Sequence, residues 1–155
     1  MSAHPNPDAG VEGRCLCGGI RFAIEFPTLF CAHCHCRWCR LAHGAAFVTW
    51  VGAAEARFRI IAGDDLLTWF HASVESRRGF CSRCGSTLFF ASSVAPGEMH
   101  VTRASLPGPL DRAPTVHVFA DEAVVWLNDA ASLPHITGEH AALAHYTAIR
   151  PTVPE

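Results

Sequence analysis

At 155 residues the chain is long enough for one domain to bury most of a conventional apolar core without help from disulfides. Half of its residues are hydrophobic and only 17% are charged, which excludes a disordered protein, and a formal net charge of -2 without a basic run argues against nucleic acid as a partner. No stretch approaches the length of a membrane span, so we expect no membrane partner either.

The first segment, residues 1–12, is mostly polar and contains two prolines, Pro5 and Pro7, and we expect it to be flexible. It contains no apolar stretch of signal-peptide length, which predicts an unsecreted, cytoplasmic protein. In the reducing cytosol, closely spaced cysteines bind metal or do redox chemistry more often than they form disulfides. The eight cysteines of this chain are therefore candidates for metal ligands.

Short segments with the sequence pattern of β-strands follow one another along the chain. The first, residues 20–26, alternates apolar and mostly polar side chains, which is the period of a half-buried strand. Residues 87–90 are apolar on both faces, which favours a central strand. The other predicted strands are residues 46–51, 57–61, 66–71, 99–103, 115–119 and 123–127. Gly63-Asp64-Asp65 is typical of a hairpin turn between two of these strands.

The spacing of these strands, with little helical periodicity between them, predicts a mainly β protein with a single domain of antiparallel sheets. We expect this domain to cover residues 13–138. Residues 139–155 form a C-terminal tail that contains helix-forming residues, and a short helix there would end before Pro151. Among the large aromatic side chains, we expect Trp126 in the core, and Trp38, Trp50 and Trp69 in the core or in the wall of a pocket.

Four of the cysteines form two short pairs far apart in the sequence, Cys15-x-Cys17 and Cys81-x-x-Cys84. Two chelating pairs on distant turns are the usual way to build a tetrahedral four-thiolate zinc site. A glycine follows each pair. Gly18 lets backbone amides approach a sulfur, and Gly85 suits the positive backbone angle that such a turn needs. The sequence therefore predicts one zinc site from these four residues.

The other four cysteines lie within the nine residues from Cys31 to Cys39, interleaved with histidine and arginine. Such crowding is a poor packing solution and indicates a second metal site. Residues 40–44 can form a helical turn that Gly44 stops, and ligands at the start of a short helix benefit from amide dipoles that favour thiolate. We expect His35 to point away from the ion. Cys31 is either a fourth ligand or a buried residue outside the site.

Three cysteine motifs stand in a specific order: Gly13-x-Cys15-x-Cys17-Gly18, Cys34-His35-Cys36-x-x-Cys39-Arg40 and Arg78-x-Phe80-Cys81-x-x-Cys84-Gly85-Ser86. In this order they resemble the glutathione-dependent formaldehyde-activating enzyme family, GFA, which includes centromere protein V-like proteins. The resemblance spans residues 13–133, because Val116-His117-Val118-Phe119 and Trp126 are similar to the family's C-terminal part. It implies a zinc-bound, β-rich fold similar to the β-tent fold.

The resemblance also implies two zinc ions per chain and a division of the cysteines between them. A structural zinc would bind Cys15, Cys17, Cys81 and Cys84. A second, catalytic-type zinc with an open position would bind Cys34, Cys36 and Cys39. Cys31 lies outside the matching positions. If it closes the second site, the alternative function is a non-catalytic zinc-binding module with two structural metal sites, because a four-thiolate zinc has no room for substrate.

By resemblance the activity would be that of a carbon-sulfur lyase like S-(hydroxymethyl)glutathione synthase. Its partners would be a small-molecule thiol, glutathione or a similar one, and formaldehyde or a related aldehyde. Such an enzyme has to supply a thiolate and hold the two reactants together. A zinc ion with three protein ligands keeps a vacant position, where a substrate thiol loses its proton near neutral pH. Glutathione brings two carboxylates, for which Arg40 and Arg78 are the candidate cations.

Overall fold

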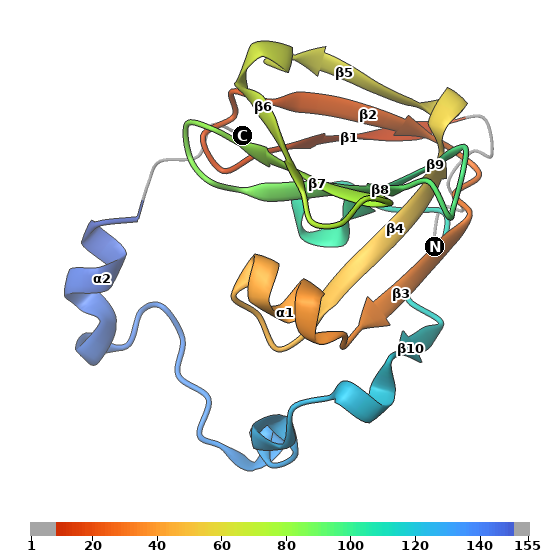
Figure 1. Cartoon of the computed structure of the whole chain (residues 1–155). Coiled ribbons are helices and arrows are strands. Elements are labelled where there is room, and N and C mark those ends of the chain that lie inside the picture. The colour runs from red at the N-terminus through yellow and green to blue at the C-terminus, as the bar shows by residue number, and fades with distance from the viewer. Residues whose placement is uncertain (1–8, 151–155) are drawn as a thin grey trace. The chain divides into compact units, whose positions relative to one another are not determined.

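The computed structural model describes residues 9–150 and confirms the mainly β architecture that the sequence predicts (Figure 1). The chain falls into two compact units, the first ending at Ala123 and the second beginning at Val124. Within the described residues, all strands belong to the first unit, and they form two sheets. No helix in residues 9–150 is long and apolar enough to cross a membrane.

The smaller sheet has three antiparallel strands in the order β1-β2-β5. They are β1 (Gly10–Arg14), β2 (Arg21–Glu25) and β5 (Phe58–Ala62). The expected flexible segment reached residue 12, and this boundary is wrong, because Val11 is buried in the core and all of β1 pairs with β2. The rest of that segment, residues 1–8, lies outside the described residues.

The larger sheet has seven strands in the order β10-β3-β4-β9-β8-β7-β6. Its strands are β3 (Phe30–Cys34), β4 (Val48–Ala54), β6 (Leu67–His71), β7 (Ser76–Cys81), β8 (Thr87–Ser92), β9 (Glu98–Thr102) and β10 (Val116–Val118). All neighbours are antiparallel except β10, which runs parallel to β3. The predicted antiparallel sheets are thus confirmed, with one parallel pair at this edge, where a long connection after β9 brings the chain back across the sheet.

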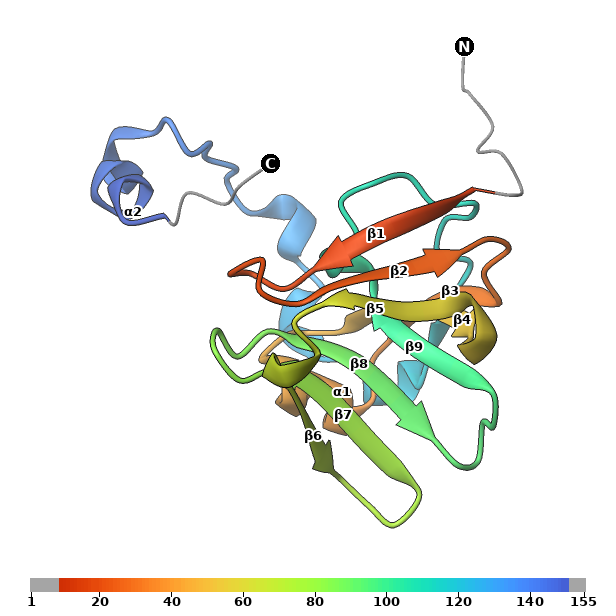
Figure 2. The ribbon, with the colours of Figure 1, turned by 90° about the horizontal axis from the view of Figure 1, so that it is seen from above.

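The main core lies between the two sheets, which Figure 2 shows one above the other. The small sheet contributes Phe22 and Phe58, whose ring centroids lie 4.9 Å and 5.1 Å from that of Phe89 on β8. Val51 and Val101 complete the opposing face of the large sheet and are fully buried. Since aromatic side chains bury large areas, these edge-on contacts fix how the sheets face each other. The central position predicted for residues 87–90 is confirmed, because β8 lies between β7 and β9.

The turn at Gly63 does not form the expected hairpin. Gly63 adopts the left-handed conformation with φ 77°, as its sequence suggests, but the strands on its two sides belong to different sheets. The short 3-10 turn Asp64–Leu66 carries the chain from β5 in the small sheet to β6 in the large one. A turn motif of this length cannot distinguish a hairpin from a crossing between sheets, because its local backbone angles are similar.

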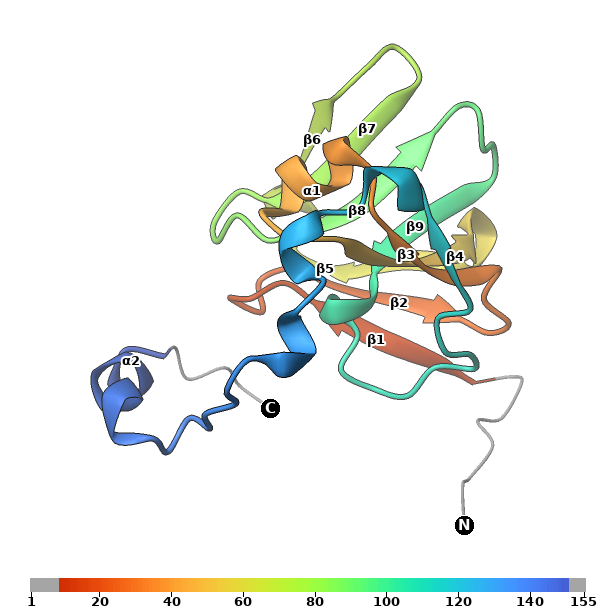
Figure 3. The same cartoon turned by 90° about the horizontal axis from the view of Figure 1, so that it is seen from below.

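The helix α1 (Arg37–His43) connects β3 to β4 and lies on the face of the large sheet away from the small sheet (Figure 3). Cys36 caps its N-terminus by accepting a hydrogen bond from the amide of Cys39. Gly44 ends it in the left-handed conformation, as predicted. The chain therefore passes from a strand into a short helix within the cysteine cluster.

The second unit contains only short helical turns within its described residues. They are the 3-10 turns Val125–Leu127, Ala130–Ser132 and Ala141–Leu143 and the helix α2 (Ala144–Ala148). The expected helix in the tail is thus present, but the expected strand at 123–127 and the core position of Trp126 are wrong. Trp126 is 69% exposed. Residues 123–127 have no partner strand among the described residues, so their backbone groups form the local hydrogen bonds of a 3-10 turn instead. The expected domain end at residue 138 falls inside this unit.

Candidate metal centres

The first candidate metal centre, the four-cysteine group, connects the two sheets. Cys15 and Cys17 lie in the turn between β1 and β2, and Cys81 and Cys84 lie at the end of β7 and in the turn that follows. Their sulfur atoms lie within 4.8 Å of one another, with 3.5 Å between Cys15 and Cys17 and 3.9 Å between Cys17 and Cys81. The two predicted pairs therefore meet in space.

Local turns position these thiols. Gly18 and Gly85, each following the second cysteine of a pair, adopt left-handed φ angles of 72° and 75°. The hydroxyl of Ser86 accepts a hydrogen bond from the amide of Leu16 at 2.9 Å and lies 3.2 Å from the sulfur of Cys84. Ser86 thus joins the two turns, so that neither pair moves independently of the other.

The protonation of the four-cysteine group is uneven. Burial raises the pKa of Cys15 to about 11. Burial also acts to raise the pKa of Cys84, but hydrogen bonds from Ser86, from the backbone of Cys17 and from the thiol of Cys81 outweigh it and lower this pKa to about 6. Four thiolates at this distance repel one another, so some keep their protons unless a cation lies among them. Two chelating thiol pairs with this spacing could hold a metal ion.

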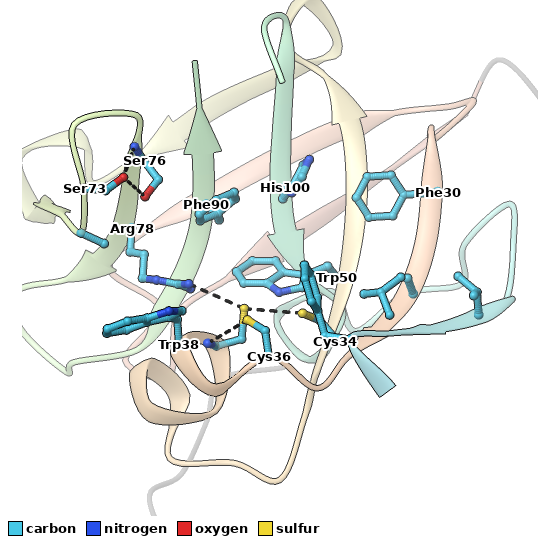
Figure 4. A pocket seen from close by; sticks show the side chains of 16 residues that line it. Phe30, Cys34, Cys36, Trp38, Trp50, Ser73, Ser76, Arg78, Phe90 and His100 are labelled. Atoms are coloured by element: carbon cyan, nitrogen blue, oxygen red, sulfur yellow. Dashed lines mark hydrogen bonds between the residues drawn. The ribbon is translucent and has the colours of Figure 1, made fainter. Parts of the chain in front are cut away.

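The second candidate centre, the three-cysteine group, lies where β3 passes into α1. Cys34 ends β3, Cys36 caps the helix and Cys39 lies in its first turn. Their sulfur atoms also lie within 4.8 Å of one another, with 3.7 Å between Cys34 and Cys39. The guanidinium of Arg78 reaches in from β7 and its Nη2 donates a hydrogen bond to the sulfur of Cys39 at 3.6 Å (Figure 4).

These contacts favour a thiolate at Cys39. A hydrogen bond from Cys34 and a second from Cys36, with the guanidinium of Arg78, lower the pKa of Cys39 to about 4 against the opposing effect of burial. The hydrogen bond with Cys39 and burial raise the pKa of Cys34. The negative charge of the group is thus already concentrated on one sulfur beside a cation. A metal ion in place of the shared protons could hold all three sulfurs as thiolates.

Cys31 does not lie with the three-cysteine group. Side chains alternate along a strand, so Cys31 and Cys34, three positions apart on β3, point to opposite faces of the large sheet. Cys31 is fully buried in the core between the sheets, and burial raises the pKa of its thiol. The sequence left open whether Cys31 is a fourth ligand or a buried residue outside the site. In the structure it is a buried residue outside the three-cysteine group.

A cavity of about 720 Å³ adjoins the three-cysteine group on the same face of the large sheet (Figure 4). Its aromatic lining comes from Phe30, Trp38, Trp50, Phe90 and Phe119. Cys34, Cys36 and Cys39 line it together with Arg78. Three sulfurs, a guanidinium and a cavity with an apolar lining thus lie together, which is the arrangement of a site that binds a small molecule.

The two arginines predicted to bind substrate, Arg40 and Arg78, have different surroundings in the structure. Arg78 lines the cavity, whereas Arg40 is absent from its lining and donates a hydrogen bond from Nε to the carbonyl of His35 at 3.0 Å. The ring of His35 lies 2.8 Å from that of His117, Nε2 to Nδ1, and so points away from the sulfurs as expected. Arg40 therefore supports the backbone beside the site and Arg78 faces into it.

Comparison with known proteins shows to which family this chain belongs. Residues 10–122 match the family described as "Glutathione-dependent formaldehyde-activating enzyme", GFA, which covers both cysteine groups and the cavity lining. This chain belongs to the GFA family. The suspected resemblance is thereby confirmed, and the match ends one residue before the end of the first structural unit.

Relatives of this GFA chain come from distant organisms. A Halomonas elongata protein, provisionally named a glutathione-dependent formaldehyde-activating enzyme, is 26% identical over 124 residues, which cover 76% of this chain and 79% of the relative. An uncharacterised lyase from Schizosaccharomyces pombe is 33% identical over 82 residues, or 52% of this chain and 56% of the relative. The crystal structure of a Rhodobacter sphaeroides protein matches with a TM-score of 0.57 and 24% identity, covering 69% of this chain and 99% of that one, and shows the shared fold.

Sequence reasoning missed most of the cavity wall of this GFA chain. It named Trp38 and Trp50 as core or pocket wall, and both line the cavity, but it did not single out Phe30, Phe90 or His100. One signal was present. A strand that is apolar on both faces packs against apolar surroundings on both sides of its sheet. On β8, Phe89 lies in the core and Phe90 lines the cavity. Finding the other wall residues requires the strand order.

Proposed function

We propose that this chain is a zinc-dependent enzyme of the carbon-sulfur lyase type, similar to S-(hydroxymethyl)glutathione synthase. It condenses glutathione or a similar thiol with formaldehyde or a related aldehyde. The observation that carries this proposal is the three-cysteine group at the wall of a cavity, beside the guanidinium of Arg78, in a chain of the GFA family. The word lyase in the name of the Schizosaccharomyces pombe relative supports the same reaction class.

Two zinc ions per chain have different roles in this proposal. Thiolate ligands select zinc over the hard abundant cations, and four of them saturate it in a tetrahedral structural site. The four-cysteine group fits that role, and the three-cysteine group fits an ion with one position left for substrate. The burial of Cys31 in the core supports the open position, because no further cysteine among the described residues lies with the three.

A zinc ion bound to three thiolates supplies a fourth position at which the substrate thiol is held as thiolate near neutral pH. The residues of the chain supply the rest. Nη2 of Arg78 stays on Cys39, and its positive charge offsets the formal charge of -1 that three thiolates and one divalent ion leave. The guanidinium of Arg78, which lines the cavity, also donates to the carbonyl oxygen of the aldehyde, where negative charge develops as the carbon-sulfur bond forms.

The cavity supplies proximity. It encloses the aldehyde against the aromatic side chains of Trp50 and Phe90 and keeps its carbonyl carbon near the thiolate. Holding two reactants together is the largest contribution available to an addition that needs no redox step. Arg40 has no direct part, since it binds the backbone of the chain. The free cysteines suit a reducing compartment, and we propose the cytoplasm, where a thiol substrate also stays reduced.

The experiment that tests this function combines metal coordination with turnover. Zinc content should be two ions per chain, and X-ray absorption should give an average of fewer than four sulfurs per ion, rising to four when the sulfur of added glutathione fills the open position. Exchange NMR should show faster formation of S-hydroxymethylglutathione with the zinc-loaded protein than without it. Four chain sulfurs at each ion and no acceleration would instead support the non-catalytic zinc-binding module.

A further inference from the structure

The floor of the cavity is one cross-strand row of the large sheet. In the strand register Phe30 pairs with Gly52, Gly52 with His100, His100 with Phe90, and Phe90 with Arg78. The glycine makes room in this row, because a Cβ on it would lie 2.2 Å from Cε1 of the Phe30 ring. The rings of Phe30 and Phe90 lie 4.9 Å and 5.6 Å from that of His100. The floor is therefore a continuous aromatic surface that ends at a guanidinium.

The rim of the cavity is also apolar. Trp38 on α1 is 74% exposed and Phe119 after β10 is 58% exposed, and both line the cavity. Phe119 adopts a left-handed backbone conformation with φ 52°, which costs free energy for a residue that is not glycine. Large aromatic side chains held in water at the mouth of a pocket are typical of a site whose ligand covers them.

The polar groups of the cavity are few. Arg78 lines the cavity, whereas Arg40 binds the backbone and Arg77 lies with its guanidinium carbon 4.2 Å from the ring of Trp69. Arg78 is 92% buried, and its Nη1 is buried without a hydrogen-bond partner among the described residues. Ser73, Ser76 and His100 also line the cavity, but Arg78 is its one guanidinium among the described residues, whereas glutathione carries two carboxylates and an ammonium group. The cavity suits a ligand with one acceptor and an apolar body.

We propose that the cavity binds the apolar substituent of an aldehyde larger than formaldehyde, an aromatic or a long aliphatic aldehyde, with its carbonyl oxygen on the guanidinium of Arg78. This inference rests on the proposed function and names its substrate class. Formaldehyde has two heavy atoms, whereas a cavity of about 720 Å³ is the size that encloses ligands ten times larger. We assign the cavity to the aldehyde and not to glutathione, because the substituent of such an aldehyde is uncharged whereas glutathione carries charged groups.

The reaction remains an addition without oxidation or reduction. The sulfur of the thiolate attacks the carbonyl carbon, the carbon-sulfur bond forms, and the π electron pair of the carbonyl moves to oxygen. That oxygen accepts a hydrogen bond from Arg78 and then takes up the proton that the thiol released. The product is a thiohemiacetal whose apolar substituent stays against Phe90 and Trp50.

Turnover with aldehydes of different substituents tests the substrate class. With zinc-loaded protein and glutathione, exchange NMR should give a kcat/KM for 3-phenylpropanal and pentanal at least ~10-fold above those for formaldehyde and for 4-oxobutanoate, a charged aldehyde of similar length, each corrected for hydration. Equal or higher values for formaldehyde would overturn the inference but leave the proposed function standing. No acceleration with any aldehyde would overturn both.

A binding measurement tests the cavity without turnover. Titration calorimetry should show that 3-phenylpropanamide, an unreactive carbonyl compound, binds at least ~10-fold more tightly than acetamide. Phe90→Ala should remove this preference, and Phe90→Leu should retain part of it. The matched control is Phe70→Ala, since Phe70 pairs with Arg78 in the same row but is 62% exposed on β6 and outside the cavity lining. Equal losses in folded Phe90→Ala and Phe70→Ala proteins would overturn the inference.

Discussion

The two cysteine groups have the same ligand chemistry in different surroundings. The four-cysteine group lies between two sheets, with Cys15 and Cys81 buried and its turns joined through Ser86. The three-cysteine group lies on the outer face of one sheet, at a strand-to-helix junction, with a cavity on one side and Arg78 beside it. The four-cysteine group thus links the two sheets, whereas the three-cysteine group lines a cavity that a ligand can enter.

We infer the different roles proposed for the two groups from their surroundings more than from their numbers of cysteines. A cluster that joins two sheets contributes its metal-binding free energy to folding. A cluster on the face of a single sheet leaves the two sheets packed through Phe22 and Phe89 whether or not it binds a metal. Variants of the two groups should therefore differ in stability, activity and metal content.

The largest expected effect is that of Cys84→Ser on stability. Loss of one ligand from the four-cysteine group should release its metal and with it a free energy comparable to the ~5–15 kcal/mol that stabilises a typical domain. We expect an unfolded or aggregated protein at 25 °C, measured by circular dichroism and by zinc content after purification. A cooperative unfolding transition close to that of the wild type would break the comparison.

Cys36→Ser should instead remove activity and keep the fold. Cys36 caps a short helix and lines the cavity, so serine can still accept the cap hydrogen bond while the metal site loses a ligand. We expect glutathione-dependent aldehyde consumption to fall to the uncatalysed rate, one zinc ion to remain, and the midpoint of thermal unfolding to shift by only a few degrees. Similar mild effects from Cys36→Ser and Cys84→Ser would contradict the assigned roles.

Arg78→Met should lower kcat/KM by about 100-fold, the usual effect of removing one donor to a developing oxyanion. The matched change Arg40→Met alters a charge near the same cysteines but one that faces a backbone carbonyl, so we expect less than about a 3-fold loss. Both proteins should retain two zinc ions, measured by elemental analysis. Equal losses from the two substitutions would mean that Arg78 acts only through its charge.

The smallest expected effect is that of Cys31→Ala. Removing a buried sulfur from the core should cost about 1 kcal/mol of unfolding free energy through the small cavity that it leaves. Zinc content should stay at two ions per chain, and aldehyde turnover should stay within about 2-fold of the wild type. Loss of one zinc ion in this variant would assign Cys31 to the metal site after all.

Local chemistry made much of this protein predictable. The pairs Cys15/Cys17 and Cys81/Cys84 meet as their spacing indicates, and Gly44 ends the helix that it was expected to end. A turn conformation or a strand period depends on neighbours within a few residues, which the sequence displays directly. The errors lie where the same local signal has two outcomes. Gly63 makes a turn in either a hairpin or a crossing, and residues 123–127 have strand composition without a partner strand.

The two cysteine groups, most of the strands and the family of this chain follow from the sequence alone. Only the tertiary structure decided which side of β3 each cysteine faces, that Arg78 and not Arg40 reaches the sulfurs, and that Phe30 and Phe90 share one aromatic floor. The physical reason is that metal-binding motifs are short and local. A cavity forms between strands that are distant in sequence, and their order and register are set by packing of the whole sheet.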